Sequence, residues 1–276
     1  MRPDEPDFGR NAAFYDQVAA HYDGQLGCSP YNHLARSAFQ DLVARFVPTG
    51  STLLDFGCGT GIDALHYARQ GYRVLAYDNS PGMVAQLEIR CQQEILAGAV
   101  TAGAADYPAF IDNFLEWPAP AAVVSNFAVL NSLRDLAPLF AAFAKRLSPP
   151  GWVIVSLLNP LHWGKVKMRG WWQDAWRRPT GPRLFSLQPY ATYLHFVTEI
   201  LRSAEDFHLV GRANAGRFVR YDDAPGRGAM ERLHHARRTW WGRSDSVRSA
   251  FARLLWQTPA YPFVGHFLFL VLRRDP

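Results

Sequence analysis

A short apolar run, Ser51 to Phe56, is followed directly by a loop that contains Gly57, Gly59 and Gly61. This succession constrains the fold more than any other feature of the chain. A continuous apolar run that ends at glycines is typical of a buried parallel strand. The residues from Gly61 to Gln70 have the apolar spacing of a helix. Glycines between a strand and a helix let the backbone pass close beneath a ligand, where a Cβ atom would collide. We therefore expect an α/β domain with a ligand site at the end of its first strand.

Strands and helices continue to alternate as far as residue 158. The spacing predicts strands at 51–56, 73–77, 99–102, 121–125 and 152–158, with helices at 61–70, 80–97 and 135–147 between them. A helical region at 11–47, broken at 27–30, precedes them, and a helix at 192–203, a strand at 207–210 and a last strand at 267–274 follow. Alternation of this kind demands a parallel, doubly wound sheet. We expect a Rossmann-like α/β fold with seven strands.

Two stretches break this regularity and are expected to be cap insertions, one after strand five and one between strands six and seven. The first is rich in Trp, Arg, Pro and Gly, and the second contains two expected helices, 228–240 and 245–256. One large domain with inserted caps suits a chain of 276 residues. We expect the N-terminal helices and the ligand-binding part at 1–158, a first insertion at 159–191 and the rest of the core at 192–213. A second insertion is expected at 214–262 and a last strand at 263–276.

The composition is globular and argues against several classes of protein. Hydrophobic residues make up 49% of the chain and charged residues 19%, which does not fit a disordered chain. A net charge of +5 is too small to indicate nucleic acid binding by itself. Cys28, Cys58 and Cys91 form no CxxC pair, so they fit a reducing compartment and indicate no metal site. The acidic N-terminus shows no signal peptide, and the apolar stretch 263–272 is too short to span a bilayer as a helix, so we expect a cytoplasmic protein.

Acidic residues end each of the first three expected strands, at Asp55, Asp78 and Asp106. The carboxyl ends of the strands are where doubly wound sheets bind their ligands. A dinucleotide loop would have its third small residue at position 62, which is Ile62 here, whereas this chain has it one place earlier, at Gly61. The carboxylate of Asp55 disfavours an anion and favours an ammonium group. The loop therefore suits a ligand with a cationic amino-acid head better than a pyrophosphate.

The segment Leu53–Gly61 resembles motif I of class I S-adenosylmethionine-dependent methyltransferases. Asp78–Met83 resembles the ribose-binding position of that family, and Ala105–Tyr107 the segment that grips adenine. Asn126–Phe127 resembles the stretch that flanks the methionine moiety, and 14–23 the N-terminal helix that closes over the cofactor. The resemblance implies S-adenosylmethionine as cofactor, with S-adenosylhomocysteine as product, held by Tyr15, Tyr22, Asp55, Gly57, Cys58, Gly59, Gly61, Asp78, Asn79, Met83, Ala105, Asp106, Tyr107, Asn126 and Phe127.

Methyl transfer from a sulfonium depends mainly on an in-line arrangement of the acceptor atom, the methyl group and sulfur. A general base helps where the acceptor is a hydroxyl or an ammonium group. The candidates near the expected mouth of the site are His21, Tyr22, His33, His162 and His195. For each of them a structural or surface role is the alternative, and the sequence does not choose among them.

The leading interpretation of the acceptor is a small molecule methylated at oxygen or nitrogen. The N/D-P-P-Y/F motif of DNA and RNA amino-methylases is absent after the fourth strand, where the chain has Asn126–Val129, so a nucleic acid acceptor is disfavoured. The segment 159–190 is rich in tryptophans and basic residues and has three alternative interpretations. It encloses an aromatic or lipid-like acceptor with an acidic group, it is a solvated basic loop whose tryptophans pack on the domain, or it touches a membrane surface. An RNA or protein methyltransferase and a non-catalytic cofactor-binding regulatory protein are the alternatives.

Overall fold

The computed structural model describes residues 5–27, 30–113, 116–162, 182–186, 190–214, 217–220 and 265–274. Most of the first expected insertion, 159–191, and of the second, 214–262, lies outside these residues, and so do the helices expected at 228–240 and 245–256. In the part of the chain that is described, no helix is both long enough and apolar enough to cross a membrane.

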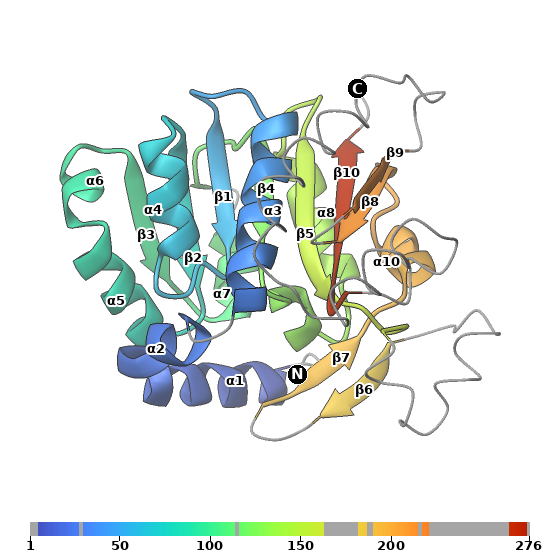
Figure 1. Cartoon of the computed structure of the whole chain (residues 1–276), viewed down its shortest axis with the longest axis horizontal. Coiled ribbons are helices and arrows are strands. Elements are labelled where there is room, and N and C mark those ends of the chain that lie inside the picture. Colours follow the sequence, from blue (N-terminus) through green and yellow to red (C-terminus); the bar gives the residue numbers. More distant parts are fainter. Residues whose placement is uncertain are drawn as a thin grey trace, which may run out of the picture.

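One sheet forms the centre of the molecule (Figure 1). Its parallel part has the order β3-β2-β1-β4-β5, with bounds β1 Thr52–Phe56, β2 Arg73–Asp78, β3 Val100–Ala104, β4 Ala122–Ser125 and β5 Trp152–Leu158. Beyond β5 follow β10 (Phe267–Arg274), β8 (Phe207–Asn214) and β9 (Arg217–Arg220), each antiparallel to its neighbour. The expected doubly wound α/β fold is confirmed, with short β9 as an additional edge strand.

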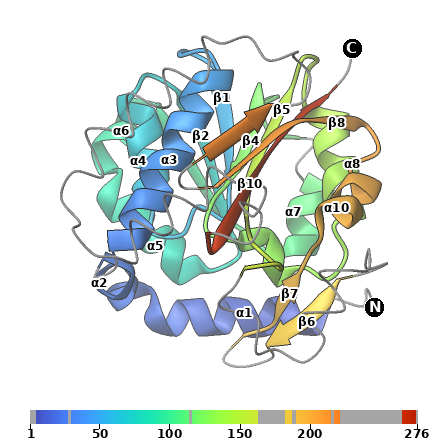
Figure 2. The same ribbon diagram turned by 45° about the vertical axis from the view of Figure 1, so that its right-hand side comes forward.

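Helices cover both faces of this sheet (Figures 1 and 2). One face carries α3 (Pro30–Phe46), α4 (Ile62–Arg69), α5 (Pro81–Arg90) and α6 (Gln92–Leu96), and the other carries α7 (Tyr107–Asn113), α8 (Ala137–Arg146) and α10 (Val197–Ser203). Successive strand side chains point to opposite faces. Leu53 therefore belongs to the core beneath α3, with Phe39, whereas Leu54 belongs to the core beneath α8, with Phe143.

The N-terminal helices lie across the carboxyl ends of the parallel strands and not on either face (Figure 1). They are α1 (Glu5–Val18), the 3-10 turn η1 (Ala19–His21) and α2 (Tyr22–Gly27). Next to α1 lies a separate antiparallel pair, β6 (Arg183–Ser186) and β7 (Thr192–Leu194), as Figure 2 also shows. A second 3-10 turn, η3 (Val129–Ser132), follows β4. These segments cover the edge at which the strand order reverses between β1 and β4.

Two expected helices differ from the structure. The helix expected at 192–203 begins only at Val197, because Thr192–Leu194 pairs with β6 as strand β7. Thr and Tyr favour such pleated pairing, and the partner strand is not visible from local spacing. The helix expected at 80–97 is interrupted at Cys91, whose backbone (φ −101°, ψ 18°) leaves the helical region.

Candidate functional site

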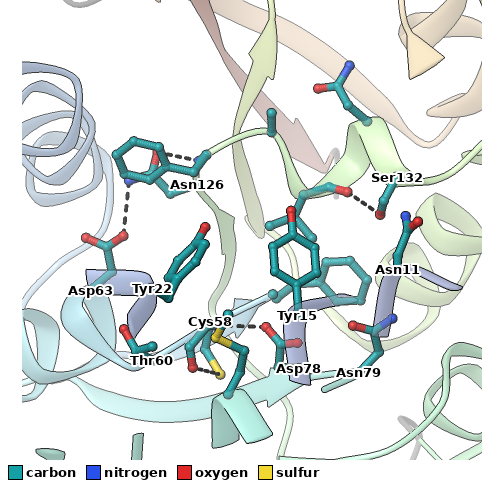
Figure 3. Close-up of a pocket in the computed structure, with 18 of the residues that line it drawn as sticks. Asn11, Tyr15, Tyr22, Cys58, Thr60, Asp63, Asp78, Asn79, Asn126 and Ser132 are labelled. Carbon is teal, nitrogen blue, oxygen red and sulfur yellow. Dashed lines mark hydrogen bonds between the residues drawn. The ribbon is translucent and has the colours of Figure 1, made fainter. Parts of the chain in front are cut away.

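A cavity of about 420 Å³ lies at the carboxyl ends of β1, β2 and β4, beneath the N-terminal helices. Its walls come from the glycine loop after β1, the residues after β2 and β4, η3, α1, α2, β6, the segment before β7 and the start of β10. Figure 3 shows part of this wall. A cavity of this size at a switch point of the sheet suits a small organic ligand.

The glycine loop after β1 has a shape that depends on glycine at two points. Gly57 has φ +78°, and a Cβ atom on it would lie 2.4 Å from Val129 of η3. Gly61 has φ +82°, and its Cβ atom would lie 2.6 Å from a leucine of α5. The N–H groups of Gly57 and Cys58 both donate to the carbonyl of Tyr77, at 2.8 and 2.9 Å. The loop is therefore held against the end of β2, and Cys58 takes part through its backbone.

Asp78 ends β2 and turns its carboxylate toward the glycine loop. Its Oδ2 accepts the N–H of Gly59 at 2.9 Å, and its Oδ1 accepts the N–H of Ser80 at 3.0 Å. Burial raises the pKa of Asp78 to about 6, although these backbone donors oppose the rise. The result is a buried carboxylate held in one orientation on the cavity wall (Figure 3).

Asp55 lies in β1, beneath the same cavity. Burial raises the pKa of its carboxyl well above the ordinary value, and the carboxylates of Asp63 and Asp78 add to the rise, while Arg36 opposes it. Its Oδ2 is buried and has no hydrogen-bond partner. A buried carboxylate without a partner is unfavourable, so this atom fits a ligand that brings a cation or a hydrogen-bond donor.

A polar network under the cavity centres on Asp63, in the first turn of α4. Its carboxylate pairs with Arg36 and accepts hydrogen bonds from Gln40 at 2.7 Å and from the amide of Asn126 at 3.1 Å. The guanidinium of Arg36 also lies over the ring of Phe127, 4.4 Å from its centroid. Sequence reasoning missed Asp63 and Arg36, because α3 and α4 meet only in the folded chain.

Aromatic rings close the cavity on the side of the N-terminal helices. The ring centroids of Tyr15 and Tyr22 are 5.9 Å apart, and that of Tyr190 lies 5.3 Å from Tyr15. Burial raises the pKa of both Tyr15 and Tyr22 above the ordinary value, and the carboxylate of Asp78 adds to this. Both hydroxyls therefore stay protonated and can donate hydrogen bonds. Figure 3 shows the two rings reaching into the middle of the cavity.

Polar contacts fasten the N-terminal helices over the cavity. The Oδ1 of Asp16 accepts the hydroxyl of Ser80 at 2.6 Å and the N–H of Gly82 at 2.8 Å. The side-chain amide of Asn11 donates to the carbonyl of Ala191 at 3.2 Å and accepts its N–H at 2.9 Å. Helix α1 is thereby joined both to the start of α5 and to the segment before β7.

Most of the residues assigned to the cofactor from the sequence meet at this cavity. Those that line it are Tyr15, Tyr22, Asp55, Gly57, Cys58, Gly59, Asp78, Asn79, Met83, Asn126 and Phe127. Gly61 lies behind the loop, against α5. Ala105, Asp106 and Tyr107 do not line the cavity. The exposed carboxylate of Asp106 accepts the N–H of Ala109 at 2.8 Å and so caps α7, while the ring of Tyr107 is buried in the core.

The structure does not bring the expected histidines to the cavity. His21 and His33 are exposed and do not line it. His195 is buried away from it, with Nε2 at 2.8 Å from the carbonyl of Leu133. His162 also lies outside the wall, with its ring centroid 5.7 Å from that of His266, which does line the cavity. Of the proton-transfer candidates from the sequence, Tyr22 alone belongs to the cavity wall, among the described residues.

Comparison with known proteins identifies a family to which the chain is matched and two relatives of similar sequence. A family model described as a methyltransferase domain matches residues 31–195, more than half of the chain. The ubiquinone biosynthesis O-methyltransferase of Xylella fastidiosa (strain 9a5c) is 31% identical over 122 residues, 43% of this chain and 47% of that protein. The aligned part thus spans about half the length of that relative. The malonyl-[acyl-carrier protein] O-methyltransferase of Yersinia pestis is 28% identical over 239 residues, 82% of this chain and 79% of that protein.

Among solved structures, the [4+2]-cyclase SpnF has the same fold. It superposes with a TM-score of 0.61 at 18% identity, and the match covers 96% of each chain. At this identity the likeness concerns the fold alone. Other structures that share the fold contain S-adenosylmethionine or S-adenosylhomocysteine.

A parallel sheet with a reversed last strand, together with a carboxylate-lined cavity at its switch point, defines the class I methyltransferase fold. The chain belongs to the S-adenosylmethionine-dependent methyltransferases of this class. This confirms the family, the enzyme class and the cofactor that the motifs predicted. The buried Oδ2 of Asp55, which has no hydrogen-bond partner, and the cavity that Asp55 and Asp78 both line fit such a cofactor, which carries an ammonium group and a ribose.

Proposed function

We propose that this protein transfers a methyl group from S-adenosylmethionine to an oxygen or nitrogen atom of a small-molecule acceptor. The observation that carries the proposal is the buried carboxylate of Asp55, which has an unsatisfied oxygen in the cavity that Asp78 also lines. A carboxylate in that position is stabilised by a cation. The amino-acid head of S-adenosylmethionine supplies one, whereas a dinucleotide would bring a pyrophosphate.

The remaining groups of the cofactor follow from the positions of the wall residues. We assign the ribose hydroxyls to Asp78, the adenine to the side of Asn79 and Met83, and the methionine moiety to Asn126 and Phe127. Tyr15 and Tyr22 cover the cofactor from the helical side. Because Asp106 caps α7 outside the wall, we do not assign the adenine amine to it. Bound in this way, the cofactor supplies an electrophilic methyl group, and the protein positions the acceptor.

The shape of the site supports a small-molecule acceptor over RNA or protein. Segments far apart in the sequence close over the cavity, and Asn11 and Tyr190 tie two of them together across it. A polymer would need an open groove instead. Both relatives are named as O-methyltransferases, which favours oxygen as the acceptor atom. We further propose that 159–191 and 214–262 are insertions that complete the acceptor side, and that an acidic group on an aromatic or lipid-like acceptor would meet the basic residues of the first.

Calorimetric titration of the whole protein tests the cofactor assignment. S-Adenosylmethionine and S-adenosylhomocysteine should bind with one molecule per chain, and NAD should not bind measurably. Asp55→Asn should weaken both adenosyl ligands, because the ammonium partner is lost. Binding of NAD alone, or adenosyl ligands that bind Asp55→Asn as tightly as the natural protein, would contradict the proposal.

A further inference from the structure

Three tyrosine rings line the cavity. Tyr15 belongs to α1, Tyr22 is the first residue of α2, and Tyr190 lies two residues before β7. The partners that we assign to the ammonium group and the ribose, Asp55 and Asp78, do not involve these rings. Three segments of the chain thus bring aromatic rings to the cavity, and the cofactor assignment gives them no chemical role beyond covering it.

The three rings form a corner with a fixed shape. The ring planes of Tyr15 and Tyr22 meet at 82°, with centroids 5.9 Å apart. The ring of Tyr190 lies 5.3 Å from that of Tyr15, tilted by 36°, and a side-chain hydrogen bond joins these two residues. Phe14 packs against both Tyr15 and Tyr190, at 5.4 and 5.0 Å between ring centroids. The corner therefore presents aromatic rings in two orientations to a ligand in the cavity.

Tyr22 lies near charged groups on both the ribose side and the methionine side of the assigned site. Burial is the main cause of its raised pKa, the carboxylate of Asp78 adds to the rise, and the guanidinium of Arg36 opposes it. Arg36 lies over the ring of Phe127, which we assign to the methionine moiety. The ring of Tyr22 is therefore close to both parts of the site, with Tyr15 beside it, as Figure 3 shows.

The covalent structure of S-adenosylmethionine brings its sulfur to the same region. Sulfur is bonded both to a carbon of the ribose and to the chain that carries the ammonium group. A cofactor with its ribose at Asp78 and its ammonium group at Asp55 would therefore have its sulfur between these two carboxylates. The tyrosine corner borders that stretch of the cavity, because Tyr22 is near Asp78 as well as near Arg36.

The charge on sulfur differs between the cofactor and its product. The sulfonium of S-adenosylmethionine is a cation, and the π face of a neutral aromatic ring attracts a cation that has lost its water. Proteins bind quaternary ammonium groups in cages of such rings. When the methyl group leaves, the electron pair of its bond stays on sulfur, which becomes a neutral thioether. An aromatic ring beside sulfur thus favours the cofactor over the product.

We infer that the rings of Tyr15 and Tyr22 bind the sulfonium through their π faces, and that the site thereby distinguishes the charged cofactor from its neutral product. The inference rests on the proposed function. The two rings hold S-adenosylmethionine while it carries the methyl group, and they hold S-adenosylhomocysteine less firmly once the charge is gone. Tyr190 and Phe14 are positioning residues, which keep the ring of Tyr15 at its angle.

Calorimetric titration of the whole protein with three adenosyl ligands tests the inference. S-Adenosylmethionine carries the sulfonium, sinefungin carries an ammonium group at the same place, and S-adenosylhomocysteine carries no charge there. Tyr22→Leu keeps an apolar side chain but removes the ring. It should weaken both charged ligands by about 5- to 30-fold and S-adenosylhomocysteine by less than about threefold. Tyr22→Phe keeps the ring and should leave the ratio of the affinities for S-adenosylmethionine and S-adenosylhomocysteine within about twofold of that in the natural protein.

Met83→Leu is the matched control at another point of the cavity wall. We assign Met83 to the adenine, which is the same in all three ligands, so any loss of affinity in this variant should be equal for them. Tyr15→Leu should repeat the selective loss expected of Tyr22→Leu. It takes the place of that variant if circular dichroism shows that Tyr22→Leu does not fold.

The opposite results separate three errors. Equal weakening of the three ligands by loss of the ring would show that the ring only covers the cofactor, and it would overturn the inference. A selective loss in Tyr22→Phe as large as that in Tyr22→Leu would assign the discrimination to the hydroxyl group and overturn the role of the π face. Failure of the natural protein to bind any of the three ligands would instead overturn the proposed function itself.

Discussion

Two parts of the cavity wall come from very different parts of the chain. The part assigned to the cofactor comes mainly from one stretch, 55–83, in which a strand, a glycine loop, a helix and a second strand follow one another. The rest of the wall includes Ser132, Tyr190 and His266, which lie on three segments far apart in the sequence. The first part is therefore encoded within one stretch of the sequence, whereas the second is assembled only when the chain folds.

The largest expected effect concerns the network beneath the part of the wall assigned to the cofactor. Asp63→Asn removes the charge opposite Arg36, which is largely buried, and leaves that guanidinium without its counter-ion. The free energy of unfolding should fall by about 3 kcal/mol, measured by urea denaturation. Asp41→Asn, on the exposed side of α3, is the control and should change it by less than about 0.5 kcal/mol. Equal stability of the two variants would show that the network does not support this part of the wall.

Asp55→Asn tests the proposed ammonium site, and Asp106→Asn serves as the comparison, because the sequence assigned both carboxylates to the cofactor. Affinity for S-adenosylhomocysteine should fall by about 2 kcal/mol, since a charge-assisted hydrogen bond is lost. Thermal stability should not fall, because a buried carboxylate with an unsatisfied oxygen is removed. Asp106→Asn should change the affinity by less than about 0.5 kcal/mol, because Asn still caps α7. A larger effect at Asp106 than at Asp55 would restore the assignment made from the motif.

The pKa of Asp78, raised to about 6 by burial, predicts a pH dependence. A folded pKa above the unfolded value of about 3.9 means that this carboxyl stabilises the fold at low pH, and that the contribution is lost as pH rises through about 6. Ribose hydroxyls prefer the ionised form as their acceptor, so affinity for S-adenosylhomocysteine should rise over the same interval and then level off. Calorimetric titration with S-adenosylhomocysteine at a series of pH values across this interval measures the change in affinity. Asp78→Asn should flatten the dependence, and an unchanged slope would remove the ribose assignment.

The smallest expected effect concerns the contact between α1 and the segment before β7. Asn11→Ala removes both hydrogen bonds to Ala191 and should lower the free energy of unfolding by about 1 kcal/mol. Dissociation of S-adenosylhomocysteine should become a few times faster, as measured by stopped flow, because α1 and the segment before β7 separate more easily. Gln17→Ala, exposed on the same helix, should change neither quantity. Identical dissociation rates for the two variants would show that this contact does not close the site.

The sequence predicted which residues of the stretch 55–83 meet at the cavity, because each of its signals is local. Apolar runs, glycines and acidic residues near strand ends predicted the parallel strands, the loop, Asp55 and Asp78, and the structure places the loop and both carboxylates on one cavity. Asp106 shows the limit of the same reasoning. It lies two residues beyond the end of β3, and its side chain turns to the first turn of α7 and lies off the wall. Position at a strand end does not determine where a side chain points.

The rest of the cavity wall could not be predicted in the same way. Four histidines were candidates from their sequence positions, yet none of them lines the cavity, and His266 entered it because β10 begins opposite the end of β5. Likewise Thr192 and Tyr193 were expected in a helix, but pairing with β6 makes them a strand. Both errors concern contacts between segments that are distant in the sequence.

The sequence alone determined that this chain is a doubly wound methyltransferase with an S-adenosylmethionine loop, because backbone conformation, apolar spacing and turn residues act over a few neighbouring positions. The tertiary structure alone decided which side chains share the cavity: Asp63 with Arg36, Asn11 with Ala191, and His266 beside Phe267. Such pairs depend on strand order and on how helices cross the sheet edge. The energy that selects them comes from burial and pairing in the assembled fold, which no local stretch of sequence contains.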